Sequence, residues 1–190
     1  MNLIKPEVYD DAVKSWEGQF APLAKWGWGP SVHAEKWNGR HAMFGWLFIC
    51  GTAHAHGHGY IPDADALLDL KQWGTLATIS GTTTISMERA VVLAANAHFF
   101  AISLAAAILP SGFGDPLFLD PNHPNYEKAA ARNNSPFGYL PAFKAGLTDE
   151  AEMINGRLAM VGLVALVFTT ALTGQNMLDI VNEWVGGAYY

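Results

Sequence analysis

The stretch Glu35-Lys36-Trp37-Asn38-Gly39-Arg40-His41-Ala42-Met43-Phe44-Gly45 decides the fold of this chain, because its pattern occurs twice. The second copy reads Glu152-Met153-Ile154-Asn155-Gly156-Arg157-Leu158-Ala159-Met160-Val161-Gly162. The two copies share seven residues at the same offsets: glutamate, asparagine, two glycines, arginine, alanine and methionine. A repeat of this kind indicates two structurally equivalent helices, related by a pseudo-two-fold axis.

The charged residues of the repeat predict how the two helices meet. Within one copy the glutamate and the arginine are five positions apart, and a helix with 3.6 residues per turn places them on different faces. They are therefore expected to pair across the helices, Glu35 with Arg157 and Glu152 with Arg40. The small residues of the repeat let two backbones, or a flat ligand, approach closely.

Apolar segments predict the fold class. We expect an all-α membrane protein with three transmembrane helices, at about 35–55, 88–109 and 150–173, the first and third crossed and pseudo-two-fold related. A short amphipathic helix is expected at about 175–185. With 190 residues, 51% of them hydrophobic and 15% charged, a single domain over residues 1–190 is the expectation.

The distribution of basic residues predicts the orientation in a membrane. The side that holds the N-terminus and the second loop would carry Lys5, Lys14, Lys25, Lys36, Lys128, Arg132 and Lys144, against Lys71 and Arg89 on the other side. Basic residues favour the cytoplasm-like side of a membrane. In a plastid, this bias places the N-terminus in the stroma.

The repeat also offers metal ligands. A carboxylate bonded to an arginine keeps lone pairs, and an asparagine three residues later lies on the same helix face. Mg²⁺ prefers hard oxygen ligands, and in a chlorophyll the macrocycle leaves one axial position for a protein atom. The alternative is that these residues only tie two helices together. Duplication of the whole pattern, with its asparagine, favours ligand binding.

Both copies resemble the first and third helices of the light-harvesting complex, or chlorophyll a/b-binding, superfamily, whose hallmark is Glu-x-x-(Asn/His)-x-Arg-x-Ala-Met. The resemblance implies chlorophyll a and carotenoids (xanthophylls) as cofactors, and it leaves a second chlorophyll type and a structural lipid open. It implies magnesium ligation by Glu35, Asn38, Glu152 and Asn155, with Arg40 and Arg157 holding the glutamates. Asn38 stands where many members carry histidine, which suggests red-shifted absorption.

Other positions follow the superfamily less closely. In the middle helix, Glu88 and Asn96 align with its ligand positions, and His98 is a further candidate. A polar residue there could equally bond a neighbouring helix. Asp115-Pro116-Leu117 resembles the loop that receives a carotenoid end group, so two crossed carotenoids are expected.

Composition excludes some functions and leaves others open. A formal charge of −6 without a basic cluster argues against a nucleic-acid partner, and without a nucleophile–base pattern we expect no enzyme. The resemblance implies an antenna protein of the plastid thylakoid membrane, multi-pass, with a photosystem core and neighbouring antenna subunits as partners. The alternatives are a photoprotective, energy-dissipating relative and a pigment-free structural membrane protein.

Three histidines alternate with small residues after the first apolar run, at His54, His56 and His58. No carboxylate or cysteine motif accompanies them, so the spacing predicts an exposed polar loop.

Overall fold

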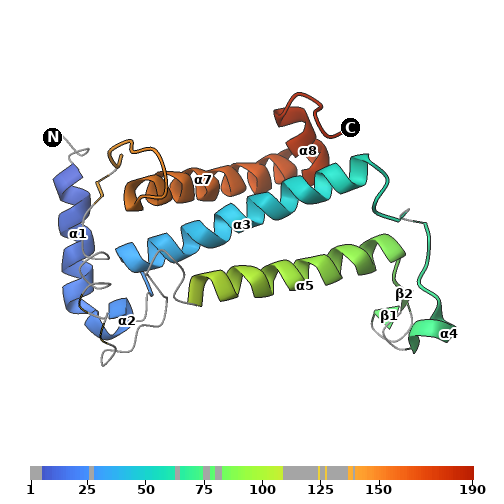
Figure 1. Ribbon diagram of the computed structural model, residues 1–190, viewed down its shortest axis with the longest axis horizontal. Helices are drawn as coiled ribbons and strands as arrows, with labels where there is room; N and C mark the ends of the chain where they lie inside the picture. Colours follow the sequence, from blue (N-terminus) through green and yellow to red (C-terminus); the bar gives the residue numbers. More distant parts are fainter. Residues whose placement is uncertain are drawn as a thin grey trace. The chain divides into compact units, whose positions relative to one another are not determined.

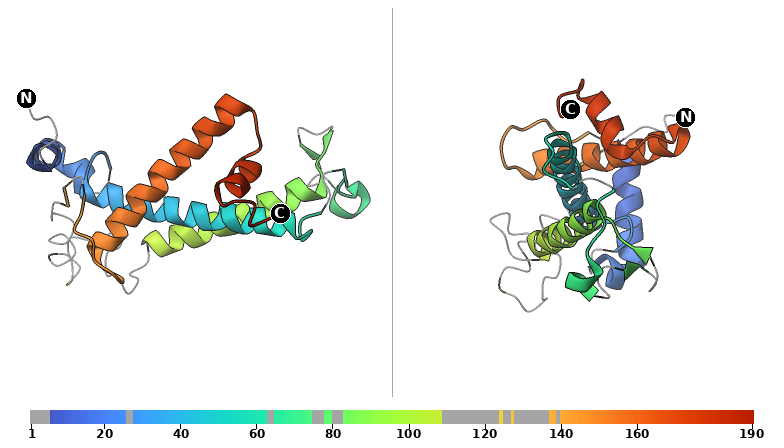
Figure 2. Two further views of the ribbon diagram at one scale, coloured as in Figure 1. Left: turned by 90° about the horizontal axis from the view of Figure 1, so that it is seen from above. Right: turned by 90° about the vertical axis from the view of Figure 1, so that its right-hand side faces the viewer.

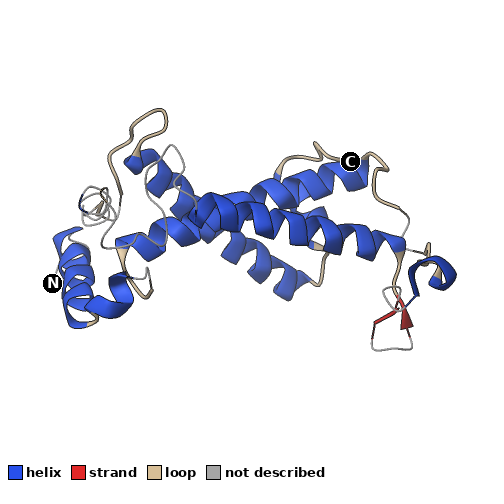
Figure 3. Ribbon diagram, turned by 60° about the horizontal axis from the view of Figure 1, so that its bottom comes forward, coloured by secondary structure: helices blue, strands red, loops and turns tan. Residues whose placement is uncertain are grey.

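The computed structural model describes residues 6–25, 28–62, 65–74, 78–79, 83–108, 124, 127, 137–138 and 140–190. Within them the helices are α1 (Pro6–Gln19), α2 (Ala21–Lys25), α3 (Val32–Gly57), α4 (Leu70–Trp73), α5 (Met87–Ile108), α7 (Asp149–Thr173) and α8 (Met177–Trp184) (Figure 1). Two short strands, β1 (Thr78–Ile79) and β2 (Thr83–Thr84), form an antiparallel pair in which Thr78 faces Thr84 and Ile79 faces Thr83 (Figure 3). The described chain is therefore predominantly helical.

Equivalent hydroxyl groups start the two repeated helices. The Ser31 hydroxyl oxygen accepts a hydrogen bond from the Ala34 amide at 3.1 Å, at the beginning of α3. The Thr148 hydroxyl oxygen accepts one from the Ala151 amide, also at 3.1 Å, at the beginning of α7. Such caps satisfy amides that have no partner inside the helix. Ser31 and Thr148 stand at the same distance before the two copies, so the equivalence extends beyond the quoted motif.

The described structure groups into two compact units. The first contains α1, α2, residues 32–45 of α3, residues 103–108 of α5 and residues 149–164 of α7. Its core consists of Val13, Val32 and Met153, with Tyr9 and Phe137 packed against them. Because these residues come from α1, α3 and α7, burial of apolar surface joins the three helices.

The second unit contains the remaining parts of α3, α5 and α7, together with α4, both strands and α8. Its core is formed by Leu166 of α7 and by Ile180 and Val181 of α8, each about fully buried. α8 occupies the segment in which an amphipathic helix is expected, with Asp179 and Glu183 on its exposed side. The expectation of a single domain over residues 1–190 stays a prediction.

The expectation of three transmembrane helices is wrong. Among the described residues, α7 is the one helix that is long and apolar enough to cross a membrane. α3 carries Glu35, Lys36 and Arg40 together with several histidines, and α5 begins with Glu88 and Arg89 and has described side chains only up to residue 105. The polar groups of α3 lower the mean hydropathy of that helix below what a span requires.

α7 itself does not behave like the core helix of a globular protein. Only 17% of its most apolar stretch is buried in the described structure. Its outward apolar side chains are Leu158, Val161, Val164, Val167, Phe168 and Leu172, each more than half exposed. An exposed apolar surface of this size marks contact with lipid, a ligand or a partner.

Candidate functional site

Two glycines bring the repeated helices together in the first unit. Gly39 of α3 and Gly156 of α7 are buried, and the N-terminal parts of these helices cross at this point (Figure 2). A Cβ atom on Gly39 would lie 2.9 Å from the Cα atom of Gly156, and the reciprocal distance is 3.0 Å. Any side chain at either position would therefore force the backbones apart.

Both predicted ion pairs are confirmed, one on each side of this crossing. The Nε atom of Arg157 lies 2.5 Å from Oε1 of Glu35, and the Nε atom of Arg40 bonds Oε1 of Glu152. The Arg40 and Glu152 side chains are each 12% exposed, against 20% and 18% for Arg157 and Glu35. Each charge is thereby compensated where little water reaches it.

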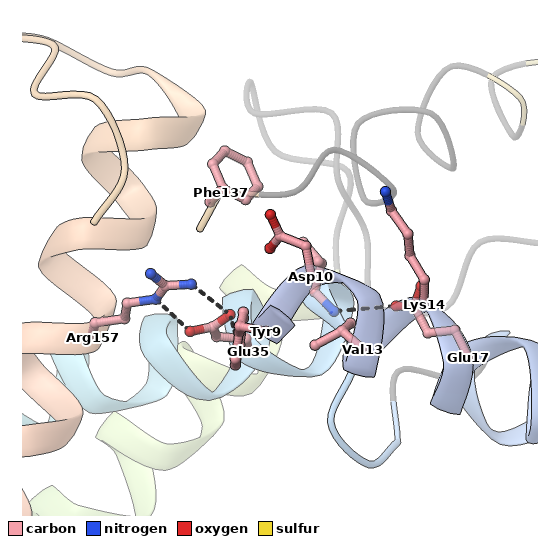
Figure 4. Close-up of a pocket in the computed structure, with 9 residues that line it drawn as sticks. Tyr9, Asp10, Val13, Lys14, Glu17, Glu35, Phe137 and Arg157 are labelled. Atoms are coloured by element: carbon pink, nitrogen blue, oxygen red, sulfur yellow. Dashed lines mark hydrogen bonds and ion pairs between the residues drawn. The ribbon is translucent and has the colours of Figure 1, made fainter. Parts of the chain in front are cut away.

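The two pairs differ in their surroundings. A second guanidinium nitrogen of Arg157 donates a hydrogen bond to Oε2 of Glu35 at 3.2 Å. The Tyr9 hydroxyl donates to the same oxygen at 3.4 Å (Figure 4). Arg157 also donates to the Gly138 carbonyl at 2.6 Å. Within the described residues, Oε2 of Glu152 has no comparable donor.

Tyr9 was not predicted as a site residue. It belongs to α1, outside the repeat, and its ring lies 5.9 Å from the guanidinium carbon of Arg157. Burial and the nearby Glu35 carboxylate raise the pKa of its phenol, so it stays a neutral donor at physiological pH. Tyr9 lies outside the quoted pattern, but Tyr126 stands at the same distance before the second copy, and this spacing is the signal that could have indicated it.

A third ion pair also escaped prediction. The Nζ atom of Lys36 lies 3.5 Å from Oδ1 of Asp149, and the lysine side chain is only 2% exposed. Lys36 follows Glu35, but the equivalent position in the second copy is Met153. This contact therefore has no symmetric counterpart that would reveal it in the sequence.

The two asparagines of the repeat face outward. The Asn38 side-chain amide donates to the Ala34 carbonyl at 2.8 Å, and this bond leaves its Oδ1 atom pointing away from the helix backbone. Both Asn38 and Asn155 are exposed. Neither asparagine is needed for the ion pairs or for the glycine contact.

An open groove of about 640 Å³ runs beside Asn38 in the first unit. α3 lines it with Glu35, Asn38 and His41, and α7 lines it with Met160, Leu163 and Val164. A groove with apolar walls and a few oxygen or nitrogen atoms is typical of sites for large organic ligands.

The α5 candidates belong to the second unit. Glu88 is partly buried in the first turn of α5, whereas Asn96 and His98 are exposed. The Nδ1 atom of His98 donates to the Ala94 carbonyl at 2.7 Å, so its Nε2 atom keeps a lone pair. The structure thus brings together the six candidates on α3 and α7 within the first unit, and the three on α5 belong to the second. Asp115-Pro116-Leu117 lies outside the described residues.

A second, smaller groove of about 260 Å³ lies in the second unit between α3 and α5. Its walls are mainly apolar, and they include Phe48 and Phe99, whose ring centroids are 5.2 Å apart. The sequence did not indicate this groove, because its walls come from two helices that are far apart in the chain.

The donor chemistry restricts what the first unit can bind. Across the part of the chain that the structure describes, no three histidine, cysteine, aspartate or glutamate side chains converge as they would around a metal ion. A bare ion would therefore lack a protein cage. A magnesium ion already held by a macrocycle needs a single axial oxygen, which Glu152, Asn38 or Asn155 can supply.

Comparison with known proteins finds short similarities. No family model matches the chain. A protein of Pyropia yezoensis called "Uncharacterized protein Ycf17" is 44% identical over 36 residues, which are 19% of this chain and 75% of that protein. The protein of the same name from Porphyra purpurea is 48% identical over 33 residues, or 17% of this chain and 69% of that protein.

Proposed function

We propose that this chain, which belongs to the Ycf17 family, is an antenna protein that binds chlorophylls and carotenoids and passes excitation energy to a photosystem. The observation that carries the proposal is the reciprocal pair of glutamate–arginine bonds around the Gly39–Gly156 contact. This arrangement holds oxygen donors rigidly beside an apolar groove. Rigid helices suit a protein that must maintain distances between pigments.

Glu152, Asn155, Asn38 and Glu35 are the residues that would ligate chlorophyll magnesium in the first unit, with Arg40 and Arg157 orienting the carboxylates. When bound, the pigments supply light absorption and excitation transfer. On α5, His98 presents a nitrogen whose tautomer is set by the Ala94 carbonyl, the usual arrangement for a metal-binding histidine. Glu88 and Asn96 remain further candidates.

A purely structural clamp explains less of what is observed. Such a clamp requires the glycines, the glutamates and the arginines, but not two exposed asparagines at equivalent positions. Asn155 lies on α7, where an exposed amide is costly in a membrane unless it has a partner. Ligation of a metal-centred pigment supplies that partner.

The setting we propose is the thylakoid membrane of a plastid, which agrees with the occurrence of Ycf17 proteins in two red algae. In this proposal α7 is the membrane-crossing helix. Lys128, Arg132 and Lys144 precede it, and no lysine or arginine follows Arg157. The positive-inside bias therefore places the start of α7 on the stromal side. A photosystem core and other antenna subunits are the partners.

The test is pigment analysis of the purified chain, with absorption and fluorescence excitation spectra. We expect the wild type to carry chlorophyll and carotenoid, and Glu152→Gln and Asn155→Leu each to lose chlorophyll. Glu150→Gln is the matched control, because this carboxylate on the same helix pairs with Lys144 instead. A folded wild type without pigment would refute the proposal, and equal losses in all three variants would refute the ligand assignment.

A further inference from the structure

The end of α3 carries a pair of histidines that the sequence did not bring together. His54 and His56 lie in α3, so the prediction of a loop is wrong for both. The His58 amide donates to the His54 carbonyl at 3.1 Å and continues the helical bonding by one residue. Residues four apart on a helix share a face, and the ring centroids of His54 and His58 are accordingly 4.0 Å apart.

The protonation of His58 is set by its surroundings. Its Nδ1 atom lies 2.9 Å from the His54 carbonyl oxygen. A carbonyl can only accept, so Nδ1 carries the proton in the neutral ring and Nε2 keeps its lone pair. Histidines that bind metals commonly donate their other nitrogen to a carbonyl in this way, which fixes both tautomer and ring orientation.

Neighbouring aromatic rings limit how far the two imidazoles can turn. Tyr60 stacks on His58, with centroids 6.1 Å apart and an angle of 18° between the planes. Tyr189 meets His54 edge-on at 6.4 Å. Both histidines are nevertheless exposed. The pair is thus held in place and open to an incoming ion.

We propose that His54 and His58 form a two-ligand site for a divalent transition-metal ion. Imidazole suits Cu²⁺, Ni²⁺ and Zn²⁺, and among these Cu²⁺ binds a given nitrogen site most tightly. Two histidines four apart on a helix are also the spacing used by helical zinc motifs. Because no set of three such ligands converges in the described residues, water completes the coordination. The ion is therefore exchangeable.

His56 offers a built-in control. It lies two positions from each of the other histidines, which turns it to a different face of the helix. Its ring instead meets that of Tyr190, with centroids 5.5 Å apart at 76°. Replacing His56 removes one imidazole from the same segment without touching the pair.

The experiment titrates the full chain, purified with a tag that contains no histidine, with Cu²⁺ alone and then with Ni²⁺. We expect one strongly bound Cu²⁺ per chain, with coupling to imidazole nitrogen in its electron paramagnetic resonance spectrum. His54→Ala and His58→Ala should each weaken binding roughly tenfold or more, while His56→Ala should bind as the wild type does. Circular dichroism checks that each variant keeps its helices.

Two results would overturn the proposal. The first is a wild type that takes up no Cu²⁺ in a fixed ratio. The second is a His56→Ala variant that loses as much affinity as His58→Ala, which would mean diffuse binding by the whole segment. Neither result bears on pigment binding, because the pair lies in the second unit and contributes no residue to the Glu152 site.

Discussion

Gly39 and Gly156 approach so closely that a methyl group on either would come within 3.0 Å of the other's Cα atom. The Cα atoms of these two glycines therefore set the separation of α3 and α7. The bonds between Glu35 and Arg157, and between Glu152 and Arg40, both depend on that separation. This dependence leads to the first two predictions.

Alanine at the crossing should destabilise the protein. Gly39→Ala and Gly156→Ala should each lower the free energy of unfolding by about 1–3 kcal/mol, because the backbones must move apart. The measurement is denaturant unfolding in detergent, followed by circular dichroism. Gly51→Ala, on the same helix with no atom within 4 Å of the added group, should be neutral or stabilising. A neutral Gly39→Ala would mean that the helices are not in contact.

Removal of one partner of the buried ion pair should cost more than removal of an exposed one. Arg40→Gln leaves the Glu152 charge uncompensated at 12% exposure, and we expect a loss of roughly 3 kcal/mol of unfolding free energy. Adding Glu152→Gln should restore part of this loss, because the stranded charge is gone. Lys144→Gln is the control, since Lys144 is 54% exposed and should change stability by about 0.5 kcal/mol or less. No recovery in the double variant would contradict a direct pair.

Alkaline titration should reveal the contact of Tyr190 with Asp179. The Tyr190 hydroxyl donates to Oδ1 of Asp179 at 2.6 Å. Partial burial and this bond raise the pKa of Tyr190 to about 12, above its usual value of 10.0. Since the folded-state pKa is the higher one, the contact stabilises the fold below pH 10 and loses its effect as the pH rises through about 12.

Phenolate absorbance measures this titration. Asp179→Asn should bring the transition back toward 10.0, because the negative charge that opposes phenolate formation is removed. Tyr190→Phe identifies the group by deleting its transition. If the titration curves of the wild type and Asp179→Asn coincide, the two side chains do not interact in solution.

The orientation of α7 can be tested with single cysteines. Cys50 is the chain's one cysteine, so Cys50→Ala provides a background for Lys144→Cys and Gln175→Cys, one on each side of α7. If α7 crosses the membrane, a membrane-impermeant maleimide added to intact thylakoids should label position 144 and not position 175. Labelling of both positions before the membrane is opened would show that α7 does not cross.

Symmetry is the reason that part of the site could be predicted from the sequence. Two copies of one pattern must form equivalent helices, and charges that cannot pair within a helix must pair between them. This reasoning identified the partners of Glu35 and Glu152 and the close approach of the glycines. It did not identify Tyr9, Lys36 or the Gly138 carbonyl, because none of these is among the positions that the two copies of the quoted pattern share.

Local sequence patterns predicted the membrane spans and the histidine segment less reliably than the repeat predicted the ion pairs. The apolar runs predicted three spans, but α7 is the one helix of the described chain that meets the requirement of length and hydropathy. The alternation of His54, His56 and His58 suggested a loop. The helix extends through that segment because its backbone bonding continues to His58.

The sequence by itself therefore determined which elements are equivalent and which charges must meet across them, since a repeat imposes the same backbone geometry twice. Only the tertiary structure decided how the two copies differ. Packing of α1 against Glu35 and Arg157 adds the Tyr9 hydroxyl to one ion pair, and the continuation of α3 toward His58 places that ring beside His54. The first outcome depends on contact with a segment outside the quoted pattern. The second depends on the helix continuing to His58, because only in a helix do residues four apart share a face.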